Sequence, residues 1–243
     1  MLTTMEEKVE LLENFGLDHL IVEPFTQEFS RLTALEFVRD ILVNRLSLKK
    51  LVIGYDHHFG RNREGNFEQL TEFGELYGFE VIEIPAQTIE SVSVSSTKIR
   101  KAIEAGDMDS ANTYLGYPYR LTGEIVKGQG LGRKLNFPTV NLRVEEDYKL
   151  VPMKGVYAVK TRVKDKEILG MMNIGYRPTV GGNGRTIEIH LLDFQGDLYG
   201  QRLRVDVLAR LRDEQKFESI EALKAQLSQD EVQTRTVLSK LKS

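Results

Sequence analysis

Hydrophobic positions in the first half of the chain recur with a helical period in some stretches and form short continuous runs in others. Helices are expected where apolar residues recur every three or four positions, over residues 5–15, 33–46, 66–77, from 96 onward and 109–115. Strands are expected at the short apolar runs, residues 19–22, 51–53 and 79–84. Strands that alternate with helices of ten or more residues indicate βαβ units and a parallel sheet, so this half is predicted to be α/β.

After residue 119 the pattern changes to successive strands. Six strands are expected, over residues 120–126, 137–142, 155–163, 166–174, 186–194 and 204–211. Because their connections are glycine-rich or charged turns without helices, they predict a closed antiparallel barrel. Two helices, residues 219–227 and 229–241, are expected to follow it. A turn-rich break at residues 116–119 divides the chain into two predicted domains, 1–116 and 117–243.

Composition and charge narrow the classes of function. The 243 residues are 41% hydrophobic and 28% charged, as in soluble globular proteins. A net charge of -3 gives no support to a general nucleic-acid binder, although a local basic patch is compatible with it. The absence of cysteine excludes disulfides and thiolate chemistry. No apolar run approaches the ~20 residues of a membrane span, so a cytoplasmic protein without membrane contact is expected.

A glycine-rich loop precedes the second predicted strand of the barrel. Three of its glycines allow positive φ angles and a close approach of the backbone to a ligand: Gly128, Gly130 and Gly132. Three cations beside them suit a phosphate group: Lys127, Arg133 and Lys134. An ordinary flexible hairpin loop is the alternative that this spacing leaves open.

The strand after this loop carries two oxygen-bearing side chains. Thr139 and Asn141 lie two positions apart and are expected to share one face, while Val140 points the other way. A hydroxyl and an amide oxygen beside a basic loop can hold Mg²⁺ with a nucleotide's phosphates. Pro138 fixes φ and removes a donor, so the strand is expected to begin near it.

The segment GRKLNFPTVNL resembles the G-R-x-L-G-F-P-T-A-N motif of riboflavin kinases, the kinase half of bacterial riboflavin kinase/FAD synthetases. The resemblance implies that Thr139 and Asn141 bind magnesium and the phosphates of ATP. Asn136 replaces a glycine of the motif, and Val140 replaces an alanine. Neither change removes a ligand, because Asn tolerates the left-handed region and Val140 is expected to face away from the site.

The strand TIEIHLLDF alternates cleanly, with Ile187, Ile189 and Leu191 on one face and Glu188 on the other. By resemblance to the E-x-H-L-x-D-F strand of riboflavin kinases, Glu188 is expected to be the catalytic base. The alternation alone equally allows Glu188 to face water outside the barrel. The segments NIGYRPTV and DLYGQRL also match the family. The sequence leaves open whether three residues in or near these segments act in the site or only in the fold: Asn173, Arg177 and Arg212.

Two loops in the first half carry candidate phosphate chemistry. The loop GYDHHFGRNREG contains Gly54 and Asp56, and its pattern alone fits a polar surface loop. In SSTKIR, hydroxyls and cations lie at the start of a helix, where free backbone N–H groups favour anions. A well-capped helix is the alternative. Both segments resemble motifs of the adenylyltransferase half of the same family, which implies nucleotide binding by Gly54, Asp56, Ser95, Ser96, Thr97 and Arg100.

One family motif is not found. The histidine turn G-x-F-D-G-x-H-x-G-H, which in the family stabilises the α-phosphorus during adenylyl transfer, does not occur in the 243 residues. The first domain is therefore expected to be an incomplete Rossmann-like nucleotidyltransferase domain with impaired FAD synthesis. An exposed sheet edge is expected to favour self-association. The sequence does not distinguish a natural truncation from an incompletely read gene or a fragment of a longer protein.

The resemblance implies phosphorylation of riboflavin to FMN with ATP as phosphoryl donor and Mg²⁺ as cofactor. A non-catalytic flavoprotein that holds FMN is the alternative from another class. The pair Thr139 and Asn141 separates the two, because a carrier has no need of a magnesium-nucleotide site.

Overall fold

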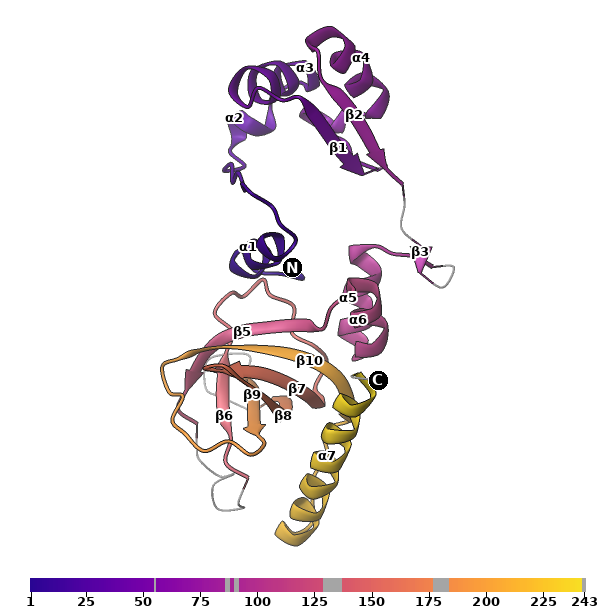
Figure 1. Ribbon diagram of the computed structural model, residues 1–243. Helices are drawn as coiled ribbons and strands as arrows, with labels where there is room; N and C mark the ends of the chain where they lie inside the picture. Colours follow the sequence, from indigo (N-terminus) through magenta and orange to yellow (C-terminus); the bar gives the residue numbers. More distant parts are fainter. Residues whose placement is uncertain (55, 86–87, 90–91, 129–136, 177–183, 242–243) are drawn as a thin grey trace. The chain divides into compact units, whose positions relative to one another are not determined.

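The computed structural model describes residues 1–54, 56–85, 88–89, 92–128, 137–176 and 184–241. The chain divides into two units, each described here by itself (Figure 1). One unit combines Met1–Leu17 with Ser95–Ser243, and the other is Asp18–Val94. The first seventeen residues therefore pack with the second half of the chain rather than with the segment that follows them.

The larger unit contains a closed six-stranded antiparallel barrel, as predicted. Its strands are β5 (Tyr119–Val126), β6 (Val140–Arg143), β7 (Gly155–Val163), β8 (Lys166–Tyr176), β9 (Arg185–Leu191) and β10 (Arg202–Arg212). They close in the order β10-β5-β6-β9-β8-β7. β6 begins at Val140 and not at residue 137, because Pro138 has no N–H to donate to a ladder.

The interior of the barrel is filled by alternate residues of its strands. On β9, Ile187, Ile189 and Leu191 are buried, whereas Glu188 and His190 are half-buried on the outer face. β5 shows the same period, with Tyr119, Leu121, Gly123 and Ile125 buried. Because the interior is occupied by the barrel's own side chains, ligands must bind at its ends or on its outer wall.

Helices cover part of this wall. α7 (Ile220–Leu241) packs against β7, β8 and β10. It joins into one helix the two helices expected at the C-terminus, because its sequence contains neither glycine nor proline. The hydroxyl of Ser228, where a break was expected, donates to the carbonyl of Lys224 inside the helix. α6 (Met108–Leu115) packs against β5 and β10, and α5 (Ser96–Ala105) packs against α6.

The N-terminal helix α1 (Met5–Asn14) is fastened to the barrel unit by a buried ion pair. Thr4 and Glu7 form a capping box at its start. Nζ of Lys149 lies 2.6 Å from Oε2 of Glu7 and 4.4 Å from the centre of the Tyr119 ring. The side chains of Lys149 and Glu7 are only 1% and 2% exposed. Burial lowers the pKa of Lys149, and the neighbouring Glu7 opposes that shift by favouring the charged form.

The unit Asp18–Val94 is built around two parallel strands, β1 (Lys50–Gly54) and β2 (Glu80–Ile84). Its helical segments are α2 (Gln27–Ser30), α3 (Ala34–Glu36), the π-helix η1 (Phe37–Arg45), the 3₁₀-helix η2 (Arg61–Arg63) and α4 (Phe67–Tyr77). The capping box of Thr33 and Glu36 is present, as the sequence predicts. β3 (Thr88–Ile89) and β4 (Val92–Ser93) form a separate hairpin.

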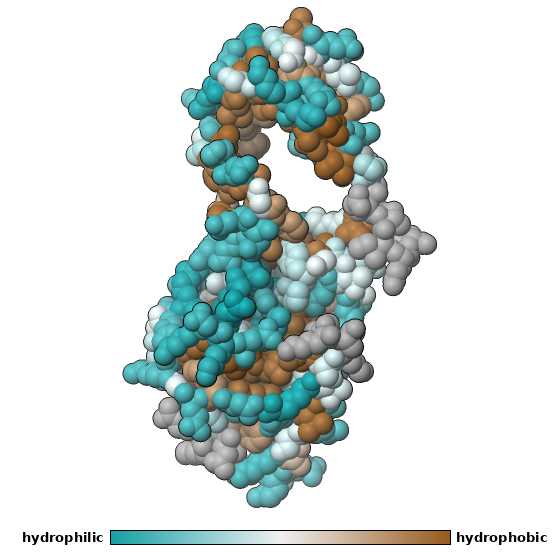
Figure 2. All heavy atoms as spheres, viewed as in Figure 1, coloured by the Kyte–Doolittle hydropathy of each residue, from teal (hydrophilic) through white to brown (hydrophobic). Residues whose placement is uncertain are grey.

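The strand predicted over residues 19–22 is wrong: this segment is irregular, and Leu20, Ile21 and Val22 are exposed. An apolar run forms a strand only when a neighbouring strand accepts its hydrogen bonds, and none of the described strands pairs with it. Hydrophobic side chains are visible at the surface of this unit in Figure 2. Among the described residues, no helix is long and apolar enough to cross a membrane.

Candidate functional site

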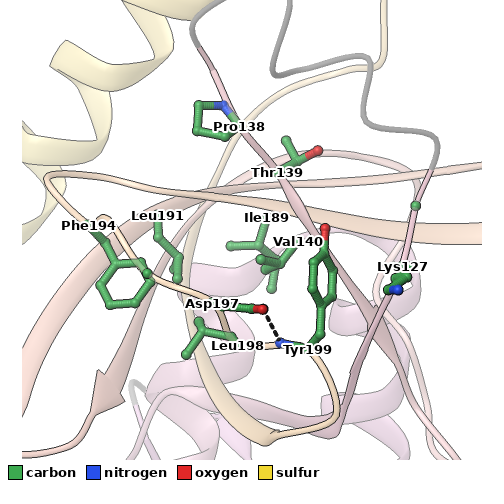
Figure 3. A pocket seen from close by; sticks show the side chains of 12 residues that line it. Lys127, Pro138, Thr139, Val140, Ile189, Leu191, Phe194, Asp197, Leu198 and Tyr199 are labelled. Carbon is green, nitrogen blue, oxygen red and sulfur yellow. Dashed lines mark hydrogen bonds between the residues drawn. The ribbon is translucent and has the colours of Figure 1, made fainter.

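The first of two adjoining cavities lies at residues of β6, β9 and the segment before β10. This cavity, called the Lys127 cavity, has a volume of about 610 Å³. Its lining residues are Lys127, Gly128, Pro138, Thr139, Val140, Ile189, Leu191, Phe194, Gly196, Asp197, Leu198 and Tyr199. Figure 3 shows the Tyr199 ring between Val140 and Lys127, and the backbone N–H of Tyr199 donates to Asp197. The cavity thus combines an aromatic ring with a cation.

The second cavity, called the Glu188 cavity, has a volume of about 320 Å³. It lies between the outer wall of the barrel, the segment after β10, and α7. Its lining residues are Phe137, Thr139, Val156, Met171, Asn173, Glu188, His190, Arg212, Glu214, Gln215, Phe217, Leu223 and Leu227. The lining mixes six apolar side chains with seven polar or charged ones, so the cavity offers both apolar surface and polar partners to a small molecule.

β9 forms part of the wall of both cavities. Its buried side chains Ile189 and Leu191 line the Lys127 cavity, whereas Glu188 and His190 on its other face line the Glu188 cavity. Thr139 is the residue that lines both. The two cavities therefore meet at the start of β6.

Thr139 and Glu188 stand close to each other at this meeting point. Oγ1 of Thr139 lies 3.5 Å from Oε2 of Glu188, at the limit of a hydrogen bond. In the sheet register Asn141 pairs with Glu188, which also pairs with Asn173 on β8. Glu188 does lie on the outer face of the barrel, as the alternation allowed, but it is half-buried in a cavity there.

At Gly128 the structure shows crowding by a neighbouring side chain rather than a positive φ angle. It is not among the described glycines with positive φ, contrary to the expectation from sequence. A Cβ atom at this position would lie 2.0 Å from Nδ2 of Asn141, so the amide of Asn141 is packed against the Gly128 backbone. Asn141 itself lines neither cavity among the described residues. Val140, expected to face away from the site, instead lines the Lys127 cavity.

Two residues that the sequence did not assign a role contribute to the Glu188 cavity. Nδ1 of His190 lies 2.8 Å from the carbonyl oxygen of Pro138. Arg212, left open between a structural and a functional role, makes three contacts of 2.7–3.1 Å with the carboxylate of Asp230, which is completely buried in α7. The motif gives no signal for either contact, because each joins residues that are far apart in the sequence.

Several predicted site residues fall outside the described residues. These are Gly130, Gly132, Arg133 and Lys134 of the glycine-rich loop, and also Arg177. Their roles stay predictions.

The candidate residues of the first half lie in both units. Ser95 caps α5, with its hydroxyl accepting from the N–H of Lys98. Arg100 donates to Ser96 over 3.0 Å and to Thr97 over 3.5 Å, so these hydroxyls and the cation form one cluster. Gly54 and Asp56 belong to the unit Asp18–Val94, where the turn after β1 is closed by a hydrogen bond from the N–H of His57 to the carbonyl of Gly54.

The oxygen atoms of Thr139 and Glu188 lie at the meeting point, and Asn141 pairs with Glu188 in the sheet register. No group of three or more His, Cys, Asp or Glu side chains suited to a metal ion occurs in the part of the chain that the structure describes. This pattern excludes a classical zinc-type cluster there. It fits Mg²⁺, which commonly takes one or two protein oxygen ligands and completes its shell with water and substrate phosphates.

Fold and site define a closed six-stranded β-barrel protein with two adjoining cavities, one that contains Lys127 and one that contains Glu188. Residues 115–238 match the riboflavin kinase family, and residues 1–98 match the FAD synthetase family. The chain belongs to the family of bifunctional riboflavin kinase/FMN adenylyltransferases.

Two curated relatives support this assignment over nearly the whole chain. The bifunctional riboflavin kinase/FMN adenylyltransferase of Listeria monocytogenes is 41% identical over 99% of this chain and 76% of its own length. That of Escherichia coli K12 is 39% identical over 96% of this chain and 74% of its own length. A crystal structure described as a macrolide-efflux protein from Streptococcus pneumoniae has the same fold, with a TM-score of 0.88 and 32% identity, and the match covers 96% of this chain and 75% of that one.

Proposed function

We propose that the riboflavin kinase reaction of the family takes place where these two cavities meet, with one substrate bound in each. The γ-phosphoryl group of ATP is transferred to the 5′-hydroxyl of riboflavin, which gives FMN and ADP. The observation that carries this proposal is the meeting of the Lys127 cavity and the Glu188 cavity at Thr139, whose hydroxyl lies 3.5 Å from the carboxylate of Glu188. The alternative of a non-catalytic flavin carrier explains neither the second cavity nor the relatives, which are enzymes.

The Lys127 cavity is the proposed nucleotide site. The Tyr199 ring offers a flat face for stacking on adenine, and Lys127 offers a positive charge for phosphate. The predicted phosphate-binding residues Gly128, Gly130, Gly132, Arg133 and Lys134 continue directly from Lys127 in the sequence. Their contribution is part of the proposal.

The Glu188 cavity is the proposed riboflavin site. Met171, Phe217 and Leu227 supply apolar surface for the isoalloxazine ring, and Asn173 supplies a polar group. The ribityl chain then leads toward Thr139, where the two cavities meet. This arrangement brings the acceptor hydroxyl to the γ-phosphate without contact between the two ring systems.

Glu188 is the proposed general base. As the new bond forms between the riboflavin oxygen and the γ-phosphorus, the bond from that phosphorus to the β-phosphate oxygen breaks and ADP leaves. The proton of the riboflavin hydroxyl passes to the carboxylate of Glu188. Thr139 and Asn141 are the proposed ligands of Mg²⁺, which when bound neutralises the phosphate charge that develops during transfer.

The Glu188→Gln variant tests this assignment because it keeps the shape of the side chain and removes the base. We expect kcat for FMN formation to fall about 10²–10⁴-fold, with riboflavin binding close to wild type. Turnover within a few-fold of wild type in a folded protein would remove Glu188 from the role. Wild-type chain that binds riboflavin but forms no FMN with ATP and Mg²⁺ would favour a carrier.

For the first half of the chain, we propose residues 1–116 as the adenylyltransferase-like domain and 117–243 as the kinase domain. The change of secondary structure supports this boundary, because Gly116 ends α6 and β5 begins at Tyr119. The compact units divide differently, since Met1–Leu17 and the residues from Ser95 onward pack with the barrel. The proposed nucleotide-binding residues are Gly54 and Asp56 in the unit Asp18–Val94, and Ser95, Ser96, Thr97 and Arg100 in the barrel unit.

We also propose that the unit Asp18–Val94 favours self-association. On one face of its two-stranded sheet Val52, Ile82 and Ile84 are 51%, 36% and 45% exposed, whereas parallel sheets are normally covered on both faces. Replacing Val52 and Ile82 by lysine should shift a concentration-dependent mass in light scattering toward the monomer. A monomeric mass for the wild-type chain at all concentrations would contradict the proposal.

A further inference from the structure

His190 contacts two consecutive residues of the segment that leads to Thr139. Its Nδ1 atom lies 2.8 Å from the carbonyl oxygen of Pro138, and its ring lies 5.1 Å from the ring of Phe137 in an edge-on arrangement. A carbonyl oxygen can only accept a hydrogen bond, so Nδ1 carries the proton and donates it. One imidazole therefore holds both the backbone and a side chain of this segment.

The segment needs such a support because the sheet does not hold it. The pairing of β6 with β9 consists of Asn141 with Glu188 and Val140 with Ile189. Continued by one step, this antiparallel register would place Thr139 opposite His190, but β6 begins only at Val140. Pro138 has no N–H with which to extend the ladder. The side chain of His190 thus supplies a hydrogen bond at the place where the regular backbone bonds stop.

This support acts at the meeting point of the two cavities. Thr139, the residue after the bonded carbonyl, lines both cavities and lies 3.5 Å from Glu188. Phe137, held by the same imidazole, lines the Glu188 cavity. A shift of Pro138 would move the Thr139 hydroxyl relative to both substrates and to the base, since the two residues share a rigid peptide unit.

We infer that His190 is a positioning residue for phosphoryl transfer: its hydrogen bond to Pro138 fixes Thr139 between the donor and acceptor cavities. The inference rests on the proposed kinase function and deepens it. His190 also lines the Glu188 cavity, but the part of its effect that passes through Thr139 falls on kcat. Reaction geometry is sensitive at this scale, and a displacement of about 1 Å lowers a rate about 10²-fold.

Three variants separate the hydrogen bond from the other contacts of the ring. His190→Phe keeps a ring beside Phe137 and removes the donor. His190→Asn keeps an N–H near the position of Nδ1 and removes the ring, and His190→Gln is its matched control because its N–H lies farther along the side chain. We expect kcat to fall about 10²-fold in the Phe variant and somewhat less in the Gln variant, with KM for riboflavin within about threefold of wild type. The Asn variant should recover most of the loss.

A fourth variant, Thr139→Ala, measures the coupling between His190 and Thr139 in a double-mutant cycle. In that background His190→Phe should add little further loss, because residues that act through one another are not additive. Equal losses in the Asn and Gln variants, or a full additional loss in the Thr139→Ala background, would overturn the inference. The Asn and Gln pair decides the question if the Phe variant does not fold. Wild-type chain that forms no FMN would overturn the proposed function and this inference with it, whereas an active wild type with an equally active Phe variant would overturn the role of His190 alone.

Discussion

The Gly128→Ala substitution tests the donor side of the site, because it adds a methyl group where the structure has no room for one. The added Cβ would lie 2.0 Å from Nδ2 of Asn141, whereas ordinary van der Waals contacts begin at 3.4 Å. The amide of Asn141 must therefore retreat by about 1.4 Å. The backbone of Gly128 is not in the left-handed region, so alanine is acceptable there in every other respect.

The expected effect is on ATP use rather than on folding. Asn141 is half-buried, and the end of its side chain can rotate away from the new methyl group. The free energy of unfolding should then change by less than about 1 kcal/mol. A ligand displaced by more than an ångström can no longer serve its phosphate or Mg²⁺, so we expect kcat/KM for MgATP to fall about 10²-fold. Riboflavin affinity should stay near that of wild type, because neither residue lines the Glu188 cavity.

A double-mutant cycle with Asn141→Ala supplies the control. In that background the added methyl group has no amide to displace, so Gly128→Ala should have little further effect on kcat/KM. Initial rates of FMN formation at varied MgATP, with unfolding in urea measured in parallel, give all four corners of the cycle. Wild-type MgATP kinetics for Gly128→Ala, or the same loss in both backgrounds, would refute the proposed role of Asn141.

Three further predictions concern other parts of the chain. Arg212 lines the Glu188 cavity and is held by the buried carboxylate of Asp230. Asp230→Asn removes that charge, so it should raise KM for riboflavin at least about tenfold and leave KM for ATP within about twofold. An equal rise in both KM values would contradict this prediction. Glu7→Gln should destabilise the barrel unit by about 3–5 kcal/mol in urea unfolding, because it leaves Lys149 buried without its countercharge, and an unchanged midpoint would contradict this. The 243 residues by themselves, incubated with FMN and ATP, should form FAD at least about 10²-fold more slowly than they form FMN from riboflavin; comparable rates would show that the missing histidine motif is dispensable.

The barrel was predictable because apolar residues alternate with polar ones along strands such as β5 and β9. β7 spans Gly155–Val163, as the sequence predicts, and the faces of β9 agree residue by residue. Two errors have different causes, one the lack of a partner among the described strands and the other a local bond within a helix. Residues 19–22 have the composition of a strand but pair with no described strand, and the hydroxyl of Ser228 bonds within a helix that was expected to break there.

The candidate site was predictable only in part. Glu188 follows from alternation together with a family motif, and Thr139 follows from the motif. The contact of His190 with Pro138 spans 52 residues, and that of Arg212 with Asp230 joins a strand to a helix. Neither can be read from local spacing, because each depends on how the barrel closes and where α7 packs. For Gly128, the expectation of a positive φ angle was wrong, and the crowding by Asn141 appears only in three dimensions.

The alternation of β9 explains how a small barrel can present two separate cavities. The side chains that point inward fill a six-stranded barrel, so they can line a cavity only at its end. The side chains that point outward can line a second cavity on the outer wall of the barrel. Ile189 and Leu191 thus line the Lys127 cavity, and Glu188 and His190 line the Glu188 cavity on the other face of the same strand. A carboxylate in mid-strand would be costly inside the barrel, but outside, under α7, it is half-buried and still reachable by a substrate. In the proposed reaction, the two-residue period of one strand would therefore separate nucleotide from flavin and place the proposed base, Glu188, on the flavin side.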